Sequence, residues 1–213
     1  MITVMMVCTG NICRSPMAEI VLRERLVREG LDQHVRVDST GVSDEEAGNP
    51  LDPRARRVLT SAGYTDHGLH THRARQIEPD DIESRDLILT MTTAHARAVR
   101  RLADRFAVPV PLDHVRMFRS FDPLAPQAAN FQDEYLLDVA DPWYGDARAF
   151  EECLAQVEAA MDGIVEHLRD VLANPPIRSP HAIQSSDAAP LSNTAPLFDA
   201  AQQLDSDPAR DDR

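Results

Sequence analysis

A polar run near the N-terminus, residues 8–15, carries side chains suited to nucleophilic chemistry on an anion. Five residues separate Cys8 from Arg14, a spacing that lets the loop curl until its backbone N–H groups converge on one anion. Arg14 supplies a planar fork for two phosphate oxygens. Ser15 can donate a hydrogen bond to the Cys8 sulfur, and Gly10 allows a tight turn. The run therefore predicts an anion cradle with a thiolate at its floor.

Other interpretations of this run are weaker. Cys8 could be a small buried residue at a strand end, with Arg14 on the surface, but the complete run between a strand and a proline-started helix favours the anion site. A Walker A loop is excluded because no Gly-Lys-Ser/Thr follows. A zinc site is disfavoured because Cys8 and Cys13 lack a matching second pair of ligands.

Phosphoryl transfer to sulfur also requires an acid that protonates the leaving group. The best candidate is Asp141, which begins the sequence Asp-Pro-Trp-Tyr-Gly. Pro142 and Gly145 indicate a turn, and the side chains of Trp143 and Tyr144 are suited to lining a slot for a phenyl ring. An ordinary Asp-Pro turn without a catalytic role is the alternative, and the cysteine loop favours the catalytic interpretation.

The surrounding pattern predicts the elements that must position these residues. Residues 2–7 form an apolar, β-branched strand, and residues 16–29 a helix with Ser15 as its N-cap. Further strands are expected at 35–39, 86–89 and 115–118, and further helices at 53–62, 94–106 and 146–172. This alternation predicts an α/β fold, a single three-layer domain with a four-stranded parallel sheet flanked by helices. The cysteine loop then leaves the first strand at its carboxyl end, where such sheets bind ligands.

Composition separates residues 1–173 from residues 174–213. The latter segment holds six of the fifteen prolines and lacks helical periodicity outside 197–204, so we expect a disordered tail. A net charge of −13 argues against nucleic-acid and membrane partners. Three cysteines, without a targeting segment or a membrane span, favour a reducing cytoplasm over a disulfide scaffold. We expect a monomer.

The chain resembles the low-molecular-weight protein tyrosine phosphatases over residues 1–173. The cysteine loop together with the Asp-Pro-aromatic-Tyr-Gly turn is specific to that family and its close relatives. The matching positions are 7–19, 37–39, 41, 52–55, 72, 74–76, 86–89 and 138–145. The resemblance implies hydrolysis of phosphotyrosine through a phosphocysteine intermediate, with no metal or organic cofactor.

The resemblance also implies a role for each residue of the site. Cys8 is the nucleophile, Arg14 the phosphate clamp and Asp141 the general acid. His72 is a partner of Asn11, which braces the loop, although a solvated histidine or a metal site with the neighbouring histidines is an alternative. The residues expected to contact the phosphate or the substrate are Thr9, Gly10, Asn11, Ile12, Cys13, Ser15, Trp143 and Tyr144. Cys13 is in addition a candidate redox partner of Cys8, or a residue that merely packs under the loop.

Three rival functions and one departure from the family pattern remain. Arsenate reduction needs resolving thiols, and apart from the loop only Cys153 is present. Protein-arginine phosphatases look as though they carry threonine at the position of Ile12, and a non-catalytic phosphate-binding module would be expected to lack Cys8 or Asp141. Family members often carry an aromatic residue after the Ser-Asp of the loop that walls the pocket, where this chain has Glu45 followed by Glu46.

Overall fold

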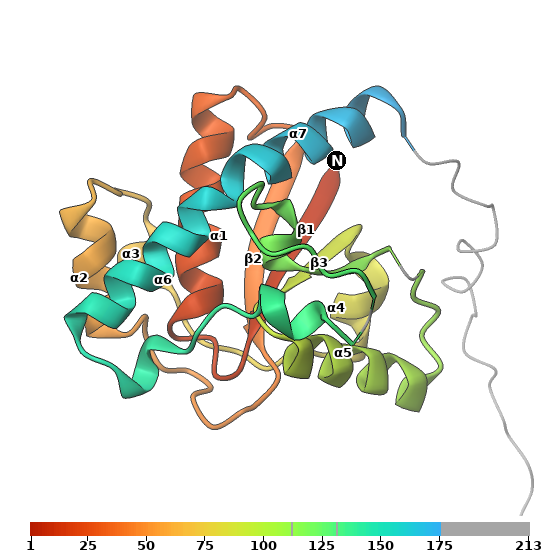
Figure 1. Cartoon of the computed structure of the whole chain (residues 1–213), viewed down its shortest axis with the longest axis horizontal. Coiled ribbons are helices and arrows are strands. Elements are labelled where there is room, and N and C mark those ends of the chain that lie inside the picture. Colours follow the sequence, from red (N-terminus) through yellow and green to blue (C-terminus); the bar gives the residue numbers. More distant parts are fainter. Residues whose placement is uncertain (112, 131, 176–213) are drawn as a thin grey trace, which may run out of the picture. The chain divides into compact units, whose positions relative to one another are not determined.

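The sheet that positions the site has four parallel strands in the order β2-β1-β3-β4. The computed structural model describes residues 1–111, 113–130 and 132–175 (Figure 1). The strands are β1 (Ile2–Cys8), β2 (Val35–Gly41), β3 (Leu87–Thr90) and β4 (Val115–Met117). Each β1 residue pairs in register with β2, from Ile2 opposite Val35 to Cys8 opposite Gly41. The predicted four-stranded parallel sheet is confirmed.

Helices connect the strands and cover both faces of the sheet. They are α1 (Arg14–Arg28), α2 (Pro53–Ser61), α3 (Gly68–Thr71), α4 (Pro79–Ser84), α5 (Thr93–Phe106), α6 (Ala147–Ala159) and α7 (Met161–Ala173). The described residues also include the 3-10 helices η1 (Phe118–Phe121), η2 (Glu134–Leu137) and η3 (Pro142–Tyr144). Among the described residues, no helix is both long and apolar enough to cross a membrane.

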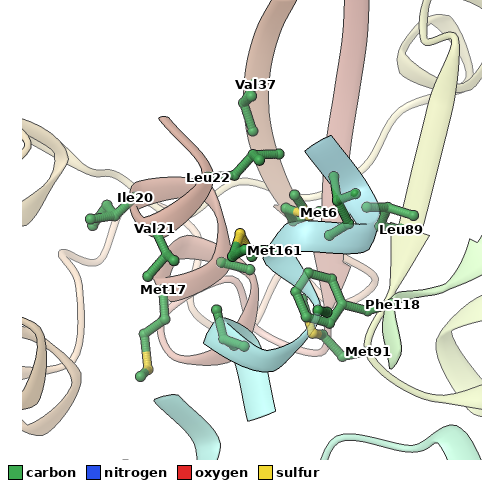
Figure 2. Close-up of a cluster of buried hydrophobic side chains, with 14 of the residues drawn as sticks. Met6, Met17, Ile20, Val21, Leu22, Val37, Leu89, Met91, Phe118 and Met161 are labelled. Atoms are coloured by element: carbon green, nitrogen blue, oxygen red, sulfur yellow. The ribbon is translucent and has the colours of Figure 1, made fainter. Parts of the chain in front are cut away.

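Alternation along β1 divides the core into two layers. Val4 and Met6 pack with the apolar residues of α1, α6 and α7, whereas Met5 and Val7 pack with those of α4 and α5. Successive side chains of a strand point to opposite faces, so one apolar strand serves both layers. Figure 2 shows the first layer, in which Met6 lies among side chains of α1 together with Met161 of α7. The three-layer arrangement is therefore confirmed.

The first helix begins earlier than the sequence predicts. Helix α1 starts at Arg14 with Cys13 as its N-cap, and no side-chain hydrogen bond caps it. The prediction of Ser15 as the N-cap is therefore wrong. The Ser15 hydroxyl faces the Cys8 sulfur and the carbonyl oxygen of Thr40, so it serves the loop and not the end of the helix.

The prediction of a single long helix over residues 146–172 is also wrong, because the helix is interrupted at Ala160, which separates α6 from α7. An apolar stripe that continues across the break hides it in the sequence. Beyond the break, Gly163 passes so close to η1 that an added Cβ would lie 2.2 Å from the carbonyl oxygen of Phe121. The tail predicted over residues 174–213, with the helical stretch 197–204, lies outside the described residues from residue 176 onward.

Candidate active site

Cys8 ends β1 at the point where the strand order reverses. β1 lies between β2 and β3, and ligands of such sheets bind beyond the carboxyl ends of strands at this point. The Cys8 side chain is buried, with 2 % of its surface exposed. Its Sγ lies 3.0 Å from the Ser15 Oγ in the first turn of α1. The sulfur thus lies beside a hydroxyl and close to the N-terminus of a helix, where backbone N–H groups can bind an anion.

Asn11 braces the loop from inside. Its backbone φ is +57°, in the left-handed region that asparagine tolerates better than most residues. The Asn11 amide nitrogen donates to Ser15 Oγ at 3.0 Å and to Ser39 Oγ at 2.8 Å. Its amide oxygen accepts from the backbone N–H of Arg75 at 3.0 Å. A fully buried asparagine therefore links the loop to β2 and to the segment before α4.

The His72 ring contacts the same residue from outside. Its Nε2 lies 2.7 Å from the carbonyl oxygen of Asn11, so the ring donates this hydrogen bond. Burial lowers the pKa of His72, which keeps the ring neutral. The expected pairing of His72 with Asn11 is thus present in the geometry. Among the described residues, no group of three or more His, Cys, Asp or Glu side chains is arranged to hold a metal ion.

Arg14 is buried and connects the loop to the Asp141 turn. Its Nη1 donates to the carbonyl oxygen of Val139 at 3.2 Å, and its Nη2 donates to Thr9 Oγ1 at 3.3 Å. Nη2 also donates to Asp141 Oδ2 at 2.5 Å. No acceptor among the described residues lies within hydrogen-bond reach of Arg14 Nε, a buried donor. The loop that begins at Cys8 and the turn that carries Asp141 therefore meet at one guanidinium group.

The turn that carries Asp141 is anchored to the start of α5. The Asp138 carboxylate accepts from the backbone N–H of Thr93 at 2.7 Å. The Val139 N–H donates to the carbonyl oxygen of Met91 at 2.8 Å. Asp141 then caps η3 through its Oδ1, while a third of its side-chain surface stays exposed. The Asp141 carboxyl group is therefore open to solvent on one side and paired with a buried guanidinium on the other.

Arg54 holds the aromatic part of this turn, and the sequence prediction did not assign it a role. Its guanidinium lies 5.1 Å from the ring centroid of Trp143 and donates to the Trp143 carbonyl oxygen at 3.1 Å. Arg54 also pairs with Asp52, whose backbone N–H donates to the carbonyl oxygen of Ile12. Tyr144 is 91 % exposed and projects into solvent. The Asp-Pro-Arg sequence at the start of α2 was the available signal for Arg54.

A short segment with three acidic residues, residues 42–46, lies against the loop that begins at Cys8. The backbone N–H groups of Val42 and Ser43 donate to the carbonyl oxygens of Cys8 and Thr9 at 2.9 and 3.0 Å. A Cβ added at Gly10 would lie 2.8 Å from Glu46 Cγ, so a larger residue there would displace the Glu46 side chain. Glu45 is exposed beside it. The segment thus presents carboxylates close to the loop.

The three cysteines are all free and buried, and they differ in environment. Burial strongly raises the pKa of Cys13 and raises that of Cys153 to about 12, so both remain neutral thiols at physiological pH. Cys8 alone has the Ser15 hydroxyl as a hydrogen-bond partner. Of the three sulfurs, that of Cys8 has the surroundings of a nucleophile.

Comparisons with known proteins agree on one family. The model of the low molecular weight phosphotyrosine protein phosphatases matches residues 3–173. A low molecular weight protein-tyrosine-phosphatase of Streptomyces coelicolor is 43 % identical over 166 residues, 77 % of this chain and 92 % of that protein. The low molecular weight protein-tyrosine phosphatase A of Mycobacterium tuberculosis is 41 % identical over 168 residues, 78 % of this chain and 91 % of that protein.

Solved structures agree with the sequences. The crystal structure of YfkJ from Bacillus subtilis superimposes with a TM-score of 0.68 at 26 % identity, covering 80 % of this chain and 96 % of that one. A protein tyrosine phosphatase from Entamoeba histolytica, with Hepes in its active site, gives a TM-score of 0.66 at 25 % identity, covering 80 % and 98 %. This chain belongs to the low molecular weight phosphotyrosine protein phosphatase family.

Proposed function

We propose that this protein is a protein-tyrosine phosphatase that hydrolyses phosphotyrosine through a phosphocysteine intermediate on Cys8. One observation carries the proposal: Cys8 lies beside the Ser15 hydroxyl, and the buried guanidinium of Arg14, from the same loop, donates to Asp141. This set provides a nucleophile, an anion-binding fork and a proton donor. Phosphoryl transfer from a phenol to sulfur requires these three groups.

In the first step, the Cys8 thiolate attacks phosphorus in line with the phenolic oxygen. The S–P bond forms while the O–P bond breaks, and Asp141 in its acid form protonates the departing phenolate. The backbone N–H groups of residues 9–14 and the Arg14 guanidinium hold the equatorial oxygens as charge redistributes. Ser15 stabilises the sulfur anion before attack through the 3.0 Å hydrogen bond.

In the second step, Asp141 acts as the base. It accepts a proton from a water molecule, which attacks the phosphocysteine and releases inorganic phosphate and the Cys8 thiolate. This mechanism uses no metal ion or organic cofactor, because the guanidinium and the backbone amides supply the positive field. The remaining loop residues, Gly10, Ile12 and Cys13, contribute their backbone N–H groups.

We further propose a catalytic unit of residues 1–173 that works as a cytoplasmic monomer on phosphotyrosine-containing proteins. The free cysteines support a reducing compartment, because the thiolate chemistry needs Cys8 reduced. The net charge of −13 supports a protein that does not bind nucleic acid or anionic membranes.

The test compares three purified proteins, the parent, Cys8→Ser and Asp141→Asn, on aryl phosphates with leaving groups of graded pKa. We expect Cys8→Ser to be inactive, because a serine hydroxyl stays protonated in the same field, while it still binds phosphate. Asp141→Asn should lose about 10²–10⁴-fold on poor leaving groups and much less on activated ones. Turnover by Cys8→Ser, or an equal loss across the series for Asp141→Asn, contradicts the assigned roles.

Substrate class is tested separately with peptides that carry phosphotyrosine, phosphoserine or phosphoarginine. We expect the highest kcat/KM for phosphotyrosine, since a pocket built for a phenyl ring gains little from the shorter phosphoserine. A preference for phosphoarginine would replace the substrate assignment and leave the covalent mechanism intact.

A further inference from the structure

The junction between β3 and α5 supports Arg14 from two directions. On one side, the carbonyl oxygen of Met91 accepts from the N–H of Val139, whose own carbonyl accepts from Arg14 Nη1 at 3.2 Å. On the other side, His95 in the first turn of α5 contacts Thr9, whose hydroxyl accepts from Arg14 Nη2 at 3.3 Å. His95 lies outside the residues that the sequence predicted for the site.

The His95 ring is fixed at both nitrogens. Its Nδ1 lies 3.0 Å from Thr92 Oγ1 and its Nε2 lies 2.9 Å from Thr9 Oγ1. Thr92 is the N-cap of α5 and also accepts from the backbone N–H of His95 at 3.3 Å. Only 4 % of the His95 surface is exposed. The ring is therefore a rigid spacer between a helix N-terminus and the nucleophile loop.

The contact between His95 Nε2 and Thr9 Oγ1 fixes the orientation of the Thr9 hydroxyl. A guanidinium only donates hydrogen bonds, so Thr9 Oγ1 must offer a lone pair to Arg14. Thr9 is exposed and directly follows Cys8, and packing alone does not fix its rotamer. Burial and the nearby Arg14 lower the pKa of His95 to about 3. The ring thus stays neutral and adds no positive charge beside the guanidinium.

We infer that His95 is a positioning residue that orients the Arg14 fork through the Thr9 hydroxyl. This inference rests on the proposed function, because it assigns Arg14 the phosphate. His95 touches no reacting atom. It acts on the ground state and the transition state alike, since the same guanidinium holds the phosphate oxygens in both.

The experiment is a double-mutant cycle of His95→Phe and Thr9→Val, with His95→Gln as the conservative variant and the exposed His34→Phe as the control. For each protein we measure kcat and KM with p-nitrophenyl phosphate, the Ki of inorganic phosphate, and Tm. Loss of one charge-assisted hydrogen bond corresponds to about a tenfold effect. We therefore expect kcat/KM to fall about tenfold and Ki to rise for His95→Phe and for Thr9→Val.

Non-additive losses in the His95 and Thr9 variants would show that both residues act on Arg14 through the same hydrogen bonds. The double variant should lose no more than either single variant, because each one breaks the same chain. His95→Gln, which retains an acceptor, should recover most of the phosphate affinity, and His34→Phe should match the parent. A multiplicative loss of about a hundredfold in the double variant overturns the inference. So does an unchanged Ki with a lowered Tm, which is the signature of a merely structural residue.

If His95→Phe does not fold, the cycle is run with the smaller His95→Ala, which also removes the hydrogen-bond acceptor, and with Thr9→Val. A full effect of Thr9→Val on Ki is still required. The activity of the parent protein distinguishes a failure of the proposed function from a failure of the role of His95. A parent without activity on aryl phosphates overturns the proposed function, whereas an active parent with additive variants overturns only the role of His95.

Discussion

Asn11 offers the sharpest test of how the nucleophile loop is held. We compare Asn11→Gly with Asn11→Ala, because the two substitutions remove the same side-chain amide and differ in how they tolerate the backbone. The amide makes three hydrogen bonds, to Ser15, to Ser39 and from the N–H of Arg75. The φ of +57° suits glycine and strains alanine.

The magnitude follows from these contacts. Three net hydrogen bonds at about 1 kcal/mol each predict a loss of about 3 kcal/mol in the free energy of unfolding for Asn11→Gly. Alanine adds the left-handed penalty of about 1–2 kcal/mol, for a total of about 4–5 kcal/mol. In a domain of this size the glycine variant should melt about 6–12 °C lower than the parent. Both variants should also lose kcat, because Ser15 is no longer held beside Cys8.

Urea unfolding and p-nitrophenyl phosphate turnover measure these effects, with Asn174→Gly as the control. Asn174 is exposed and its side chain makes one long hydrogen bond of 3.4 Å, so this variant should stay within about 0.5 kcal/mol of the parent. Equal stability of Asn11→Gly and Asn11→Ala would refute the role of the positive φ. A loss below about 1 kcal/mol in both would refute the bracing network itself.

Four further predictions concern redox chemistry, acid, charge and the C-terminal segment. Peroxide should convert the Cys8 thiolate to a sulfenic acid that condenses with the Cys13 thiol, with loss of water. Dithiothreitol should then restore the parent but not Cys13→Ala, and mass mapping should find the disulfide. The pKa of His95 is lowered to about 3, so its contribution to stability is complete above pH 6.5 and is lost as pH falls towards 3. Urea unfolding of His95→Gln should therefore depend less on pH in that window. Glu45→Arg should raise kcat/KM for peptides with acidic flanks, an effect that shrinks with salt in steady-state assays. Deleting residues 176–213 should leave kcat on p-nitrophenyl phosphate unchanged, because the family match ends at residue 173.

The parts of the molecule that the sequence predicted are those with local signals. An apolar β-branched run predicts β1, and the spacing between Cys8 and Arg14 predicts the loop that follows it. The alternation of strands and helices predicts a parallel sheet, and its carboxyl edge predicts where the site lies. The turn at Asp141 was found because proline, glycine and two aromatic residues follow the carboxylate within one short stretch.

The missed parts depend on contacts between distant segments. Helices α3 and α4 span only four and six residues, too few for an apolar period to show. Helix α4 is held by a capping box and by the ion pair of Asp81 with Arg75. Arg54 and His95 reach the site from other helices, and no local pattern marks a side chain that acts at a distance in the sequence. The break at Ala160 was invisible because the apolar stripe continues on both sides of it.

The contacts of the site differ widely in how far along the chain they reach. The pairing of Cys8 with Ser15 closes within 7 residues, and that of Asn11 with Arg75 spans 64, whereas Arg14 and Asp141 are 127 residues apart. During synthesis at about 5–20 residues per second, the residues that brace the anion loop through Asn11 are therefore made seconds before Asp141. Helices α6 and α7, which complete the core against α1, are made later still. Because a domain generally folds as a unit, the loop and the acid come together in one folding event near the end of synthesis.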